Sequence, residues 1–330
     1  MKIKLCKRNF FCFLMIALLV VSVSSALAGN EQATFPDKPI YIIVGAGPGG
    51  GSDIPARALA ASAPEFLNNQ PVIVVNRPGS NGMVAAKYVA NQAPDGYTLL
   101  MGWGGPEYTF GRHVQKLPID LFNDFKPVTG VISYSSCIAV PSSSPFKTLN
   151  DLVEYAKKNP GKLTWTHTGK AGTHWINGAN FFKLANIKLT EVPNATGGAN
   201  ARNMVAGGHV DVGFFATFLA KPVLGDKLRI LAVAFPQRDG IVPDVPTFQE
   251  EGYDIANAYD IKLLAASAGT PDWKIKRLFE GFKKAMDSTS FKSIVENANF
   301  TTLGLDPEET LKLVEDKDDQ FGKLAKDLLK

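Results

Sequence analysis

The segment Tyr41-Ile-Ile-Val-Gly-Ala-Gly-Pro-Gly-Gly-Gly-Ser-Asp53 decides the fold. Its first four residues favour a strand, five glycines follow within the next seven residues, and Ser52 and Asp53 are typical of a helix start. The order predicts a strand, a loop and a helix. Because glycine lacks a Cβ, such a loop can adopt positive φ angles and leave its N–H groups uncovered beside the positive end of the helix dipole. The segment therefore predicts a site for a carboxylate or a phosphate.

Gly45, Gly47 and Gly50 also match the G-x-G-x-x-G spacing of dinucleotide-binding loops. That fingerprint needs an acidic residue at the end of the next strand, where it binds the ribose hydroxyls. The next predicted strand, residues 71–75, ends instead at Asn76-Arg77. An exported dinucleotide-dependent oxidoreductase that uses residues 45–50 remains an alternative, as does a tight turn that binds nothing. We expect no catalytic residue, since the chain has no G-x-S-x-G, H-E-x-x-H or P-loop sequence.

Residues 1–28 predict a signal peptide. Four basic residues precede an apolar stretch at 10–23, and Ala26-Leu-Ala28 fits an A-x-A cleavage site. We expect cleavage after about Ala28 and a periplasmic product. No lipobox cysteine follows the apolar stretch, which favours a soluble product over a lipid-anchored one.

The net charge of the mature chain bears on its partners, its cysteine content on disulfide formation and its length on the number of domains. Removing residues 1–28 lowers the number of Lys and Arg residues from 35 to 31, which equals the 31 acidic residues. The mature chain is therefore nearly neutral. Its charge gives no reason to expect nucleic acid or membrane lipid as a partner. Cys137 is the only cysteine outside the predicted signal, so an intramolecular disulfide is not expected. The remaining 330 − 28 = 302 residues suffice for two domains of about 150 residues each.

Strand and helix patterns alternate along the chain and predict an α/β fold. In the first half, strands at 72–75 and 97–101 alternate with helices near 55–67 and 83–91, which predicts a largely parallel sheet with its loops at one edge. The apolar run at 128–140 predicts a strand leaving this domain. A second unit repeats the order with a strand at 163–167, glycine-bearing loops at 168–174 and 193–198, helices at 175–184 and 199–206, and a strand at 228–234. A strand at 261–265 returns to the first domain, and a helical tail starts at Thr270-Pro271 and again at Asp306-Pro307.

Several short segments, in order along the mature chain, resemble one family: the exported solute receptors of tripartite tricarboxylate transporters, also called Bug receptors. The matching segments are Pro39-Ile40 with Pro48-Gly-Gly-Gly-Ser-Asp53, Asn76-Arg-Pro-Gly79 with Gly82, Pro94-Asp-Gly-Tyr-Thr-Leu-Leu100, Gly208-His-Val-Asp211, Arg238 with Pro243-Asp-Val-Pro-Thr247, Glu251-Gly-Tyr253 and Gly269-Thr-Pro271.

The resemblance implies a type II periplasmic-binding-protein fold, in which two α/β lobes joined by crossing strands close on a small carboxylated molecule. It implies residues 36–135 with 258–330 as lobe 1 and residues 136–257 as lobe 2. The implied partners are a small organic anion, a mono- or dicarboxylate, and the membrane permease that receives it. No enzyme activity, cofactor or metal is implied, and a monomer is expected. Effector-binding modules of regulators share this fold, but such a protein should carry a DNA-binding region and no signal, the reverse of this chain.

By analogy, the glycine-bearing loops of both lobes form the ligand site. The expected ligand-binding residues are Ala46, Pro48, Gly49, Gly50, Gly51, Ser52, Asp53, Arg77, Gly79, Ser80, Asn81, Gly82 and Trp103 in lobe 1, and Thr168, Gly169, Ala171, Gly172, Thr173, His174, Thr196, Gly197, Asn200 and Thr217 in lobe 2. Ala46 stands where the family commonly has an aromatic residue, and Asn194 where a tyrosine is common. Trp103 and Tyr134 are therefore proposed as replacement aromatic surface, and the identity of the solute stays open.

The roles of Asp53, of Arg77 and of the two histidines each allow two interpretations. Asp53 orders the loop or ligand-bound water, or else it is an ordinary acid favoured by the helix dipole. Arg77 pairs with an anion or faces solvent. His167 and His174 fit satisfied polar roles better than metal ligation, because no carboxylate or cysteine pattern accompanies them.

Overall fold

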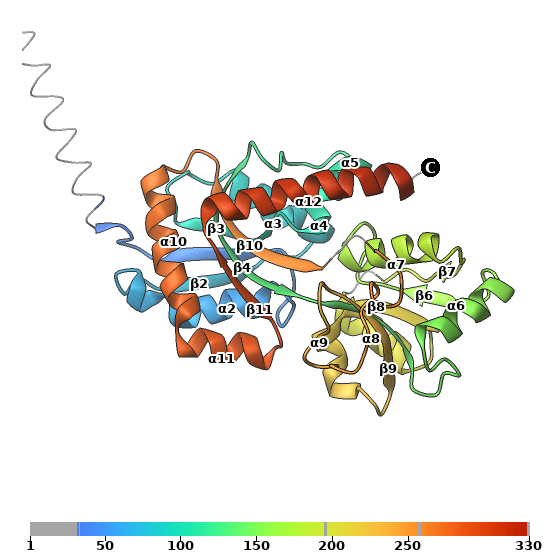
Figure 1. Cartoon of the computed structure of the whole chain (residues 1–330). Coiled ribbons are helices and arrows are strands. Elements are labelled where there is room, and N and C mark those ends of the chain that lie inside the picture. The colour runs from blue at the N-terminus through green and yellow to red at the C-terminus, as the bar shows by residue number, and fades with distance from the viewer. Residues whose placement is uncertain (1–31, 33, 195–196, 256–258, 329–330) are drawn as a thin grey trace, which may run out of the picture.

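The computed structural model describes residues 32, 34–194, 197–255 and 259–328. The predicted signal peptide, the predicted lobe boundary at 257–258 and Thr196 lie outside the described residues. The described chain forms two α/β lobes side by side (Figure 1). Within these residues, no helix is both long and apolar enough to cross a bilayer.

The first lobe is built on a six-stranded sheet in the order β11-β4-β10-β3-β1-β2. Its strands are β1 (Ile40–Val44), β2 (Val72–Asn76), β3 (Thr98–Trp103), β4 (Phe125–Tyr134), β10 (Asp260–Ser267) and β11 (Thr301–Leu305). β1 pairs in parallel with β2 and β3, as predicted. The prediction of a largely parallel sheet is wrong for the other half, where β10 runs antiparallel to β3 and β4, and β11 antiparallel to β4. The reason is that β10 enters this sheet from the second lobe and not through a helical crossover.

The second lobe is built on a five-stranded sheet in the order β7-β6-β8-β5-β9. Its strands are β5 (Ser136–Pro141), β6 (Thr164–Thr166), β7 (Thr190–Glu191), β8 (Val212–Ala216) and β9 (Leu228–Ala234). The single strand predicted at 128–140 is in fact two strands, β4 and β5, which belong to different sheets and are separated only by Ser135. The chain thus passes from lobe to lobe at Ser135 and has returned by Asp260 (Figure 1).

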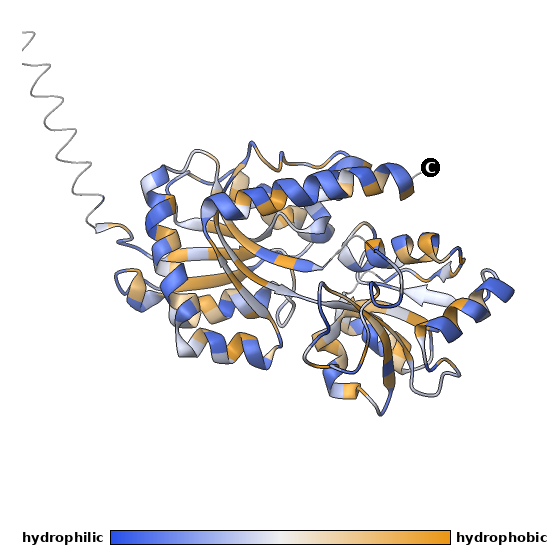
Figure 2. Cartoon of the chain, in the orientation of Figure 1, coloured by the Kyte–Doolittle hydropathy of each residue, from blue (hydrophilic) through white to orange (hydrophobic). Residues whose placement is uncertain are grey.

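Helices cover both sheets. Those of the first lobe are α2 (Asp53–Ser62), α3 (Met83–Ala90), α4 (Pro106–Thr109), α5 (Gly111–Val114), α10 (Asp272–Asp287), α11 (Thr289–Asn297) and α12 (Pro307–Leu328). Those of the second are α6 (Leu149–Lys158), α7 (Thr173–Leu184), α8 (Gly198–Ala206) and α9 (Thr217–Ala220), and three short 3-10 turns complete the description: η1 (Pro64–Phe66), η2 (Ser80–Gly82) and η3 (Lys221–Val223). Apolar residues gather on the sheets and inner helix faces and polar residues on the outer faces (Figure 2).

Side-chain capping marks the start of α12 but not that of α10. The predicted helix start at Asp306-Pro307 is confirmed, and a capping box holds it: the Asp306 N–H donates to Glu309 Oε2 at 2.9 Å and the Glu309 N–H donates to Asp306 Oδ1 at 2.8 Å. At α10 the predicted start is one residue early: Pro271 holds the N-cap position and the helix begins at Asp272. The Thr270 hydroxyl instead donates to the Ser267 carbonyl at 2.7 Å.

The two lobes also touch away from the crossing strands. Phe110 and Phe321 of the first lobe pack with Ile176 of α7 in a shared apolar cluster. The ring centroids of Phe110 and Trp175 lie 6.1 Å apart. The C-terminal helix α12 therefore bridges to the second lobe and limits how far the lobes can separate at that edge.

Candidate functional site

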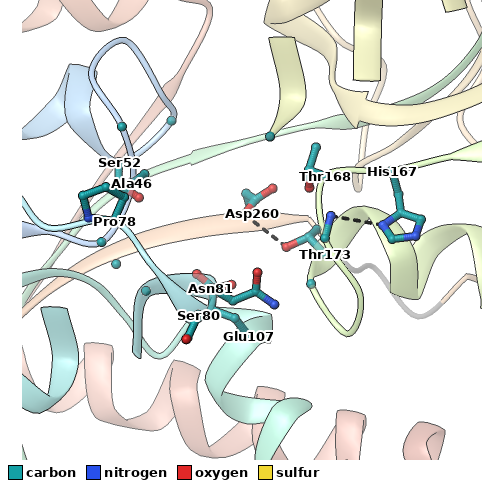
Figure 3. A pocket seen from close by; sticks show the side chains of 18 of the residues that line it. Ala46, Ser52, Pro78, Ser80, Asn81, Glu107, His167, Thr168, Thr173 and Asp260 are labelled. Carbon is teal, nitrogen blue, oxygen red and sulfur yellow. Dashed lines mark hydrogen bonds between the residues drawn. The ribbon is translucent and has the colours of Figure 1, made fainter. Parts of the chain in front are cut away.

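A cavity of about 930 Å³ lies between the lobes. Its walls are the ends of strands and the loops that follow them, as expected for ligand sites in open α/β sheets. The lining residues are 45–47, 51–52, 78–82, 101–102, 107–108 and 134 from the first lobe, 167–170, 172–173, 191, 193–194 and 197 from the second, and Asp260 and Lys262 from β10. Figure 3 shows labelled side chains from both lobes facing this space.

The first glycine loop is held by Asp53, which is 1% exposed. Its Oδ2 accepts hydrogen bonds from the Gly49 N–H and Arg57 Nε, both at 2.8 Å, and its Oδ1 accepts one from Asn76 Nδ2, also at 2.8 Å. Burial acts to raise the pKa of Asp53, but these hydrogen bonds outweigh burial and leave the pKa below its ordinary value. Asp53 does not line the cavity. Of its two interpretations, the structure favours loop ordering.

The loop that follows β2, residues 77–82, packs directly on the first glycine loop, residues 45–52. A Cβ placed on Gly45 would lie 2.6 Å from Gly82 Cα, so only glycine permits this approach of the two backbones. Gly82 itself has φ 87°, and Asn81 has φ 51°. The two loops thus form one continuous wall of the cleft.

Each lobe presents main-chain donors at the cavity that have no acceptor among the described residues. Gly51 and Ser52 in the first lobe, and Thr168 and Thr173 in the second, line the cavity. Their N–H groups donate to no acceptor among the described residues. Such N–H groups in a cleft are suited to bind an anion, because they bring partial positive charge without a competing side chain.

One hydrogen bond already joins the two walls. Asn81 Nδ2 in the first lobe donates to the Lys170 carbonyl in the second at 3.0 Å. Gly169 has φ 150°, and a Cβ there would approach Asn81 Oδ1 to 2.9 Å. The first-lobe loop at residues 78–82 and the second-lobe loop at residues 168–172 are therefore in contact beside the cavity that both line.

His167 and Asn194 order the second-lobe wall. His167 Nε2 lies 3.0 Å from Glu191 Oε1, and Nδ1 accepts the Gly169 N–H at 3.1 Å. Burial lowers the pKa of His167, which favours the neutral ring. Asn194 Nδ2 donates to the carbonyls of His167 and Gly197, at 3.1 and 2.9 Å.

The floor of the cavity carries a buried charged cluster that the sequence analysis missed. Lys262 Nζ lies 2.9 Å from Asp260 Oδ1 and 3.9 Å from Glu107 Oε1. Thr173 Oγ1 also donates to Asp260 Oδ1 at 3.1 Å (Figure 3). Burial acts to raise the pKa of Asp260, but Lys262 outweighs it and the pKa lies below its ordinary value. The sequence did contain a signal for this cluster. Asp260 and Lys262 lie two positions apart in an otherwise apolar strand, and residues at that spacing share one face of a sheet.

Tyr134 provides the aromatic surface at this floor. Its ring stacks on Phe300 with centroids 5.0 Å apart, and it lines the cavity. Trp103 does not line the cavity. It is fully buried, and its Nε1 donates to the Leu121 carbonyl at 3.0 Å. Its side chain packs in the core beside β10, so the hypothesis of Trp103 as ligand surface is corrected.

Of the other expected site residues, many line the cavity: Ala46, Gly51, Ser52, Gly79, Ser80, Asn81, Gly82, Thr168, Gly169, Gly172, Thr173 and Gly197. Others lie outside its lining: Pro48, Gly49, Gly50, Asp53, Arg77, Ala171, His174, Asn200 and Thr217. Arg77 is exposed and lies 3.8 Å from the ring centroid of Tyr88. Thr217 is buried, with its hydroxyl 2.5 Å from that of Ser135. His174 is buried behind Asp260, where burial lowers its pKa to about 4.

Two α/β lobes, joined by crossing strands and enclosing a cavity lined by loop donors, define a type II periplasmic binding protein. A solved periplasmic binding protein, BugD, matches the chain with a TM-score of 0.80 and 25% identity, over 89% of this chain and 98% of that one. The family described as "Tripartite tricarboxylate transporter family receptor" matches residues 43–329. The chain therefore belongs to that family of solute receptors.

Two further relatives extend this comparison. A UPF0065 protein from the gbd 5′ region of Cupriavidus necator is 33% identical over 288 residues, which is 87% of this chain and 86% of the relative. The MatC protein of Rhodopseudomonas palustris, solved with bound malate, is 25% identical with a TM-score of 0.78, over 88% of this chain and 100% of that one.

Proposed function

We propose that this chain is an exported receptor, processed after about Ala28 and located in the periplasm. It captures a small mono- or dicarboxylate between lobe 1 (residues 36–135 and 258–330) and lobe 2 (residues 136–257). It then delivers the solute, as a monomer, to the membrane permease of a tripartite tricarboxylate-type transporter. It is a binding protein and not an enzyme, and it needs no cofactor.

The observation that carries this proposal is the pair of facing donor sets. Gly51 and Ser52 from one lobe, and Thr168 and Thr173 from the other, bring unused N–H groups to one cavity. A hydrogen bond to a charged acceptor contributes about 1.5–3 kcal/mol. Three or four such bonds, less the cost of ordering, reach about −8 kcal/mol, which corresponds to micromolar affinity. A solute that touches both donor sets stabilises the closed arrangement of the lobes.

The oxidoreductase alternative has less support. A dinucleotide site needs an acidic group where Asn76 stands. Asn76 instead donates through Nδ2 to the Ala46 carbonyl at 2.9 Å and to Asp53 Oδ1 at 2.8 Å. The membership of the chain in a family of receptors, together with this use of Asn76, favours the solute receptor.

Native mass spectrometry of gently purified mature protein tests the proposal. We expect one small organic acid per chain, released on denaturation and identified by its mass. A released dinucleotide would support the oxidoreductase instead. A protein that retains nothing and gains no mass when incubated with a mixture of carboxylates would contradict the receptor proposal.

Replacing Asn81 should weaken binding of the retained solute. We expect Asn81→Gly to lower affinity about fivefold, because it removes a hydrogen bond between the lobes worth about 1 kcal/mol. Glycine suits the φ of 51° at this position, so the fold should be little affected. Titration calorimetry measures the change. Asn69→Gly, also at positive φ but outside the cleft lining, is the matched control and should bind as the parent does.

A further inference from the structure

Glu107 places a carboxyl group in the cleft that is open to a solute. Its side chain lines the cavity and keeps 20% of its surface exposed (Figure 3). Within the part of the chain that the structure describes, no hydrogen bond joins this carboxyl to another residue. Lys262 Nζ lies 3.9 Å from Glu107 Oε1 but 2.9 Å from Asp260 Oδ1, so the lysine pairs first with Asp260. The Glu107 carboxyl is therefore free to bond a molecule in the cavity.

The Glu107 carboxyl also lies near the main-chain donors of the first lobe. A Cβ added to Gly51 would clash with Tyr134 Oη, so the Tyr134 hydroxyl lies against the first glycine loop. Lys262 Nζ lies 5.6 Å from the centroid of the Tyr134 ring and 3.9 Å from Glu107. The series of contacts from Gly51 to Glu107 thus passes through only two side chains. A carboxylate bound to the Gly51 N–H group comes close to the carboxyl of Glu107.

The charged groups that face Glu107 belong to β10. Burial raises the pKa of Glu107 above its ordinary value, although Lys262 acts to lower it. Burial acts to lower the pKa of Lys262, but Asp260 outweighs burial and leaves that pKa well above its ordinary value. Asp260 itself has a lowered pKa. Lys262 and Asp260 therefore stay a charged pair near neutral pH, while Glu107 is poised to gain a proton.

The other titratable side chains around the cavity offer no comparable group beside the first-lobe donors. Burial raises the pKa of Tyr108 and of Tyr134, so both hydroxyls stay neutral. Burial lowers the pKa of His167, and it lowers that of His174, behind Asp260, to about 4. Glu191 lies in the second-lobe wall, where its Oε1 is 3.0 Å from His167 Nε2.

We propose that Glu107 takes up a proton when a carboxylate solute binds, and that it donates this proton in a hydrogen bond to the solute. This inference rests on the proposed function and adds a binding residue and a pH dependence to it. Two carboxylates that meet in a cavity do not both stay ionised, because like charges repel and burial removes the water that would screen them. The proton comes from the solvent, and it returns there when the solute leaves.

Binding should therefore strengthen as the pH falls. The solute raises the pKa of Glu107 in the complex above the value in the free protein. Affinity is weakest above both values, rises by up to about tenfold per pH unit between them, and is constant below the lower one. We expect the solute to bind at least about fivefold more tightly at pH 6.5 than at pH 8.5.

Titration calorimetry of the unmodified mature protein measures the proton directly. The probes are succinate, malate, glutarate and propionate, which are largely ionised in this pH range. For the probe that binds most tightly, titrations at one pH in two buffers of different ionisation enthalpy give the number of protons taken up. We expect at least about 0.3 proton per site at one or more pH values in the range. Binding without uptake at any of these pH values would overturn the role of Glu107 and leave the receptor proposal intact. Absence of binding by every probe would overturn both.

A variant assigns the proton to Glu107. Glutamine retains a hydrogen-bond donor and cannot titrate, so Glu107→Gln should bind the same probe with no proton uptake and an affinity that changes less than about twofold across the range. Glu191→Gln replaces the other glutamate of the lining and is the matched control, which should keep the uptake. Uptake that persists in Glu107→Gln, or a folded Glu107→Gln that binds no probe, would contradict the assignment. If that variant does not fold, Glu107→Ala provides the uptake measurement.

Discussion

Asp53→Ala should lower the free energy of unfolding by about 2–3 kcal/mol. The substitution removes a carboxylate that is 1% exposed and accepts hydrogen bonds from Gly49, Arg57 and Asn76. Arg57 is half exposed and can turn to water, so most of the cost comes from the Gly49 N–H and the Asn76 amide. The first glycine loop should also lose its fixed shape, and solute binding should weaken with it. Urea denaturation of the two proteins measures the difference.

The control separates loop ordering from a simple dipole effect. Asp272 occupies the first turn of α10, as Asp53 does in α2, but its side chain is 91% exposed. A dipole effect alone contributes about 0.3–1 kcal/mol at either helix. If Asp272→Ala and Asp53→Ala destabilise the protein equally, the loop-ordering role of Asp53 is wrong.

The stabilisation by Asp53 should depend on pH. Because the pKa of Asp53 in the folded chain lies below the ordinary value of 3.8, the carboxylate stabilises the fold above that value. The contribution disappears as the pH falls through the folded pKa. The gap in stability between the parent and Asp53→Asn should therefore be constant near neutral pH and shrink in strong acid.

Gly51→Ala should destabilise the protein by about 1–3 kcal/mol and weaken solute binding by at least about tenfold. A Cβ at position 51 would lie 2.2 Å from Tyr134 Oη and 2.6 Å from Cζ. The Tyr134 ring is held between Phe300, with centroids 5.0 Å apart, and Phe218, at 5.4 Å. Because the ring has little room to move, the loop must shift and take its donors with it.

Gly47→Ala is the matched control for this prediction. It lies in the same loop, and a Cβ there would meet no atom within 4 Å. Its free energy of unfolding should stay within about 0.5 kcal/mol of the parent. Equal loss of stability in the two variants would show that alanine is unfavourable anywhere in the loop and that the Tyr134 contact is irrelevant.

The first three strands and their loops could be predicted from sequence because each depends on local pattern. Residues 41–53 contain strand formers, glycines and helix-start residues in order, and β1 and α2 follow that order. The second glycine loop, residues 77–82, could be predicted from local pattern in the same way. Its packing on the first, through Gly45 and Gly82, follows from two local features meeting at one sheet edge.

The missed features depend on residues far apart in the chain. Glu107 and Lys262 are 155 positions apart, and only the antiparallel insertion of β10 beside β3 brings them together. Trp103 was misassigned because an aromatic residue at the end of a buried strand can face either the cleft or the core. The short elements α11 and β11 were missed, since neither shows a long periodic pattern.

The central claim is that main-chain donors from both lobes bind one carboxylated solute, and isothermal titration of the mature protein tests it most directly. Small mono- and dicarboxylates would be compared beside the uncharged amide of each. The account predicts one site per chain, micromolar affinity for at least one acid, and no measurable binding of its amide. Equal binding of acid and amide, or no binding of any acid, would contradict it.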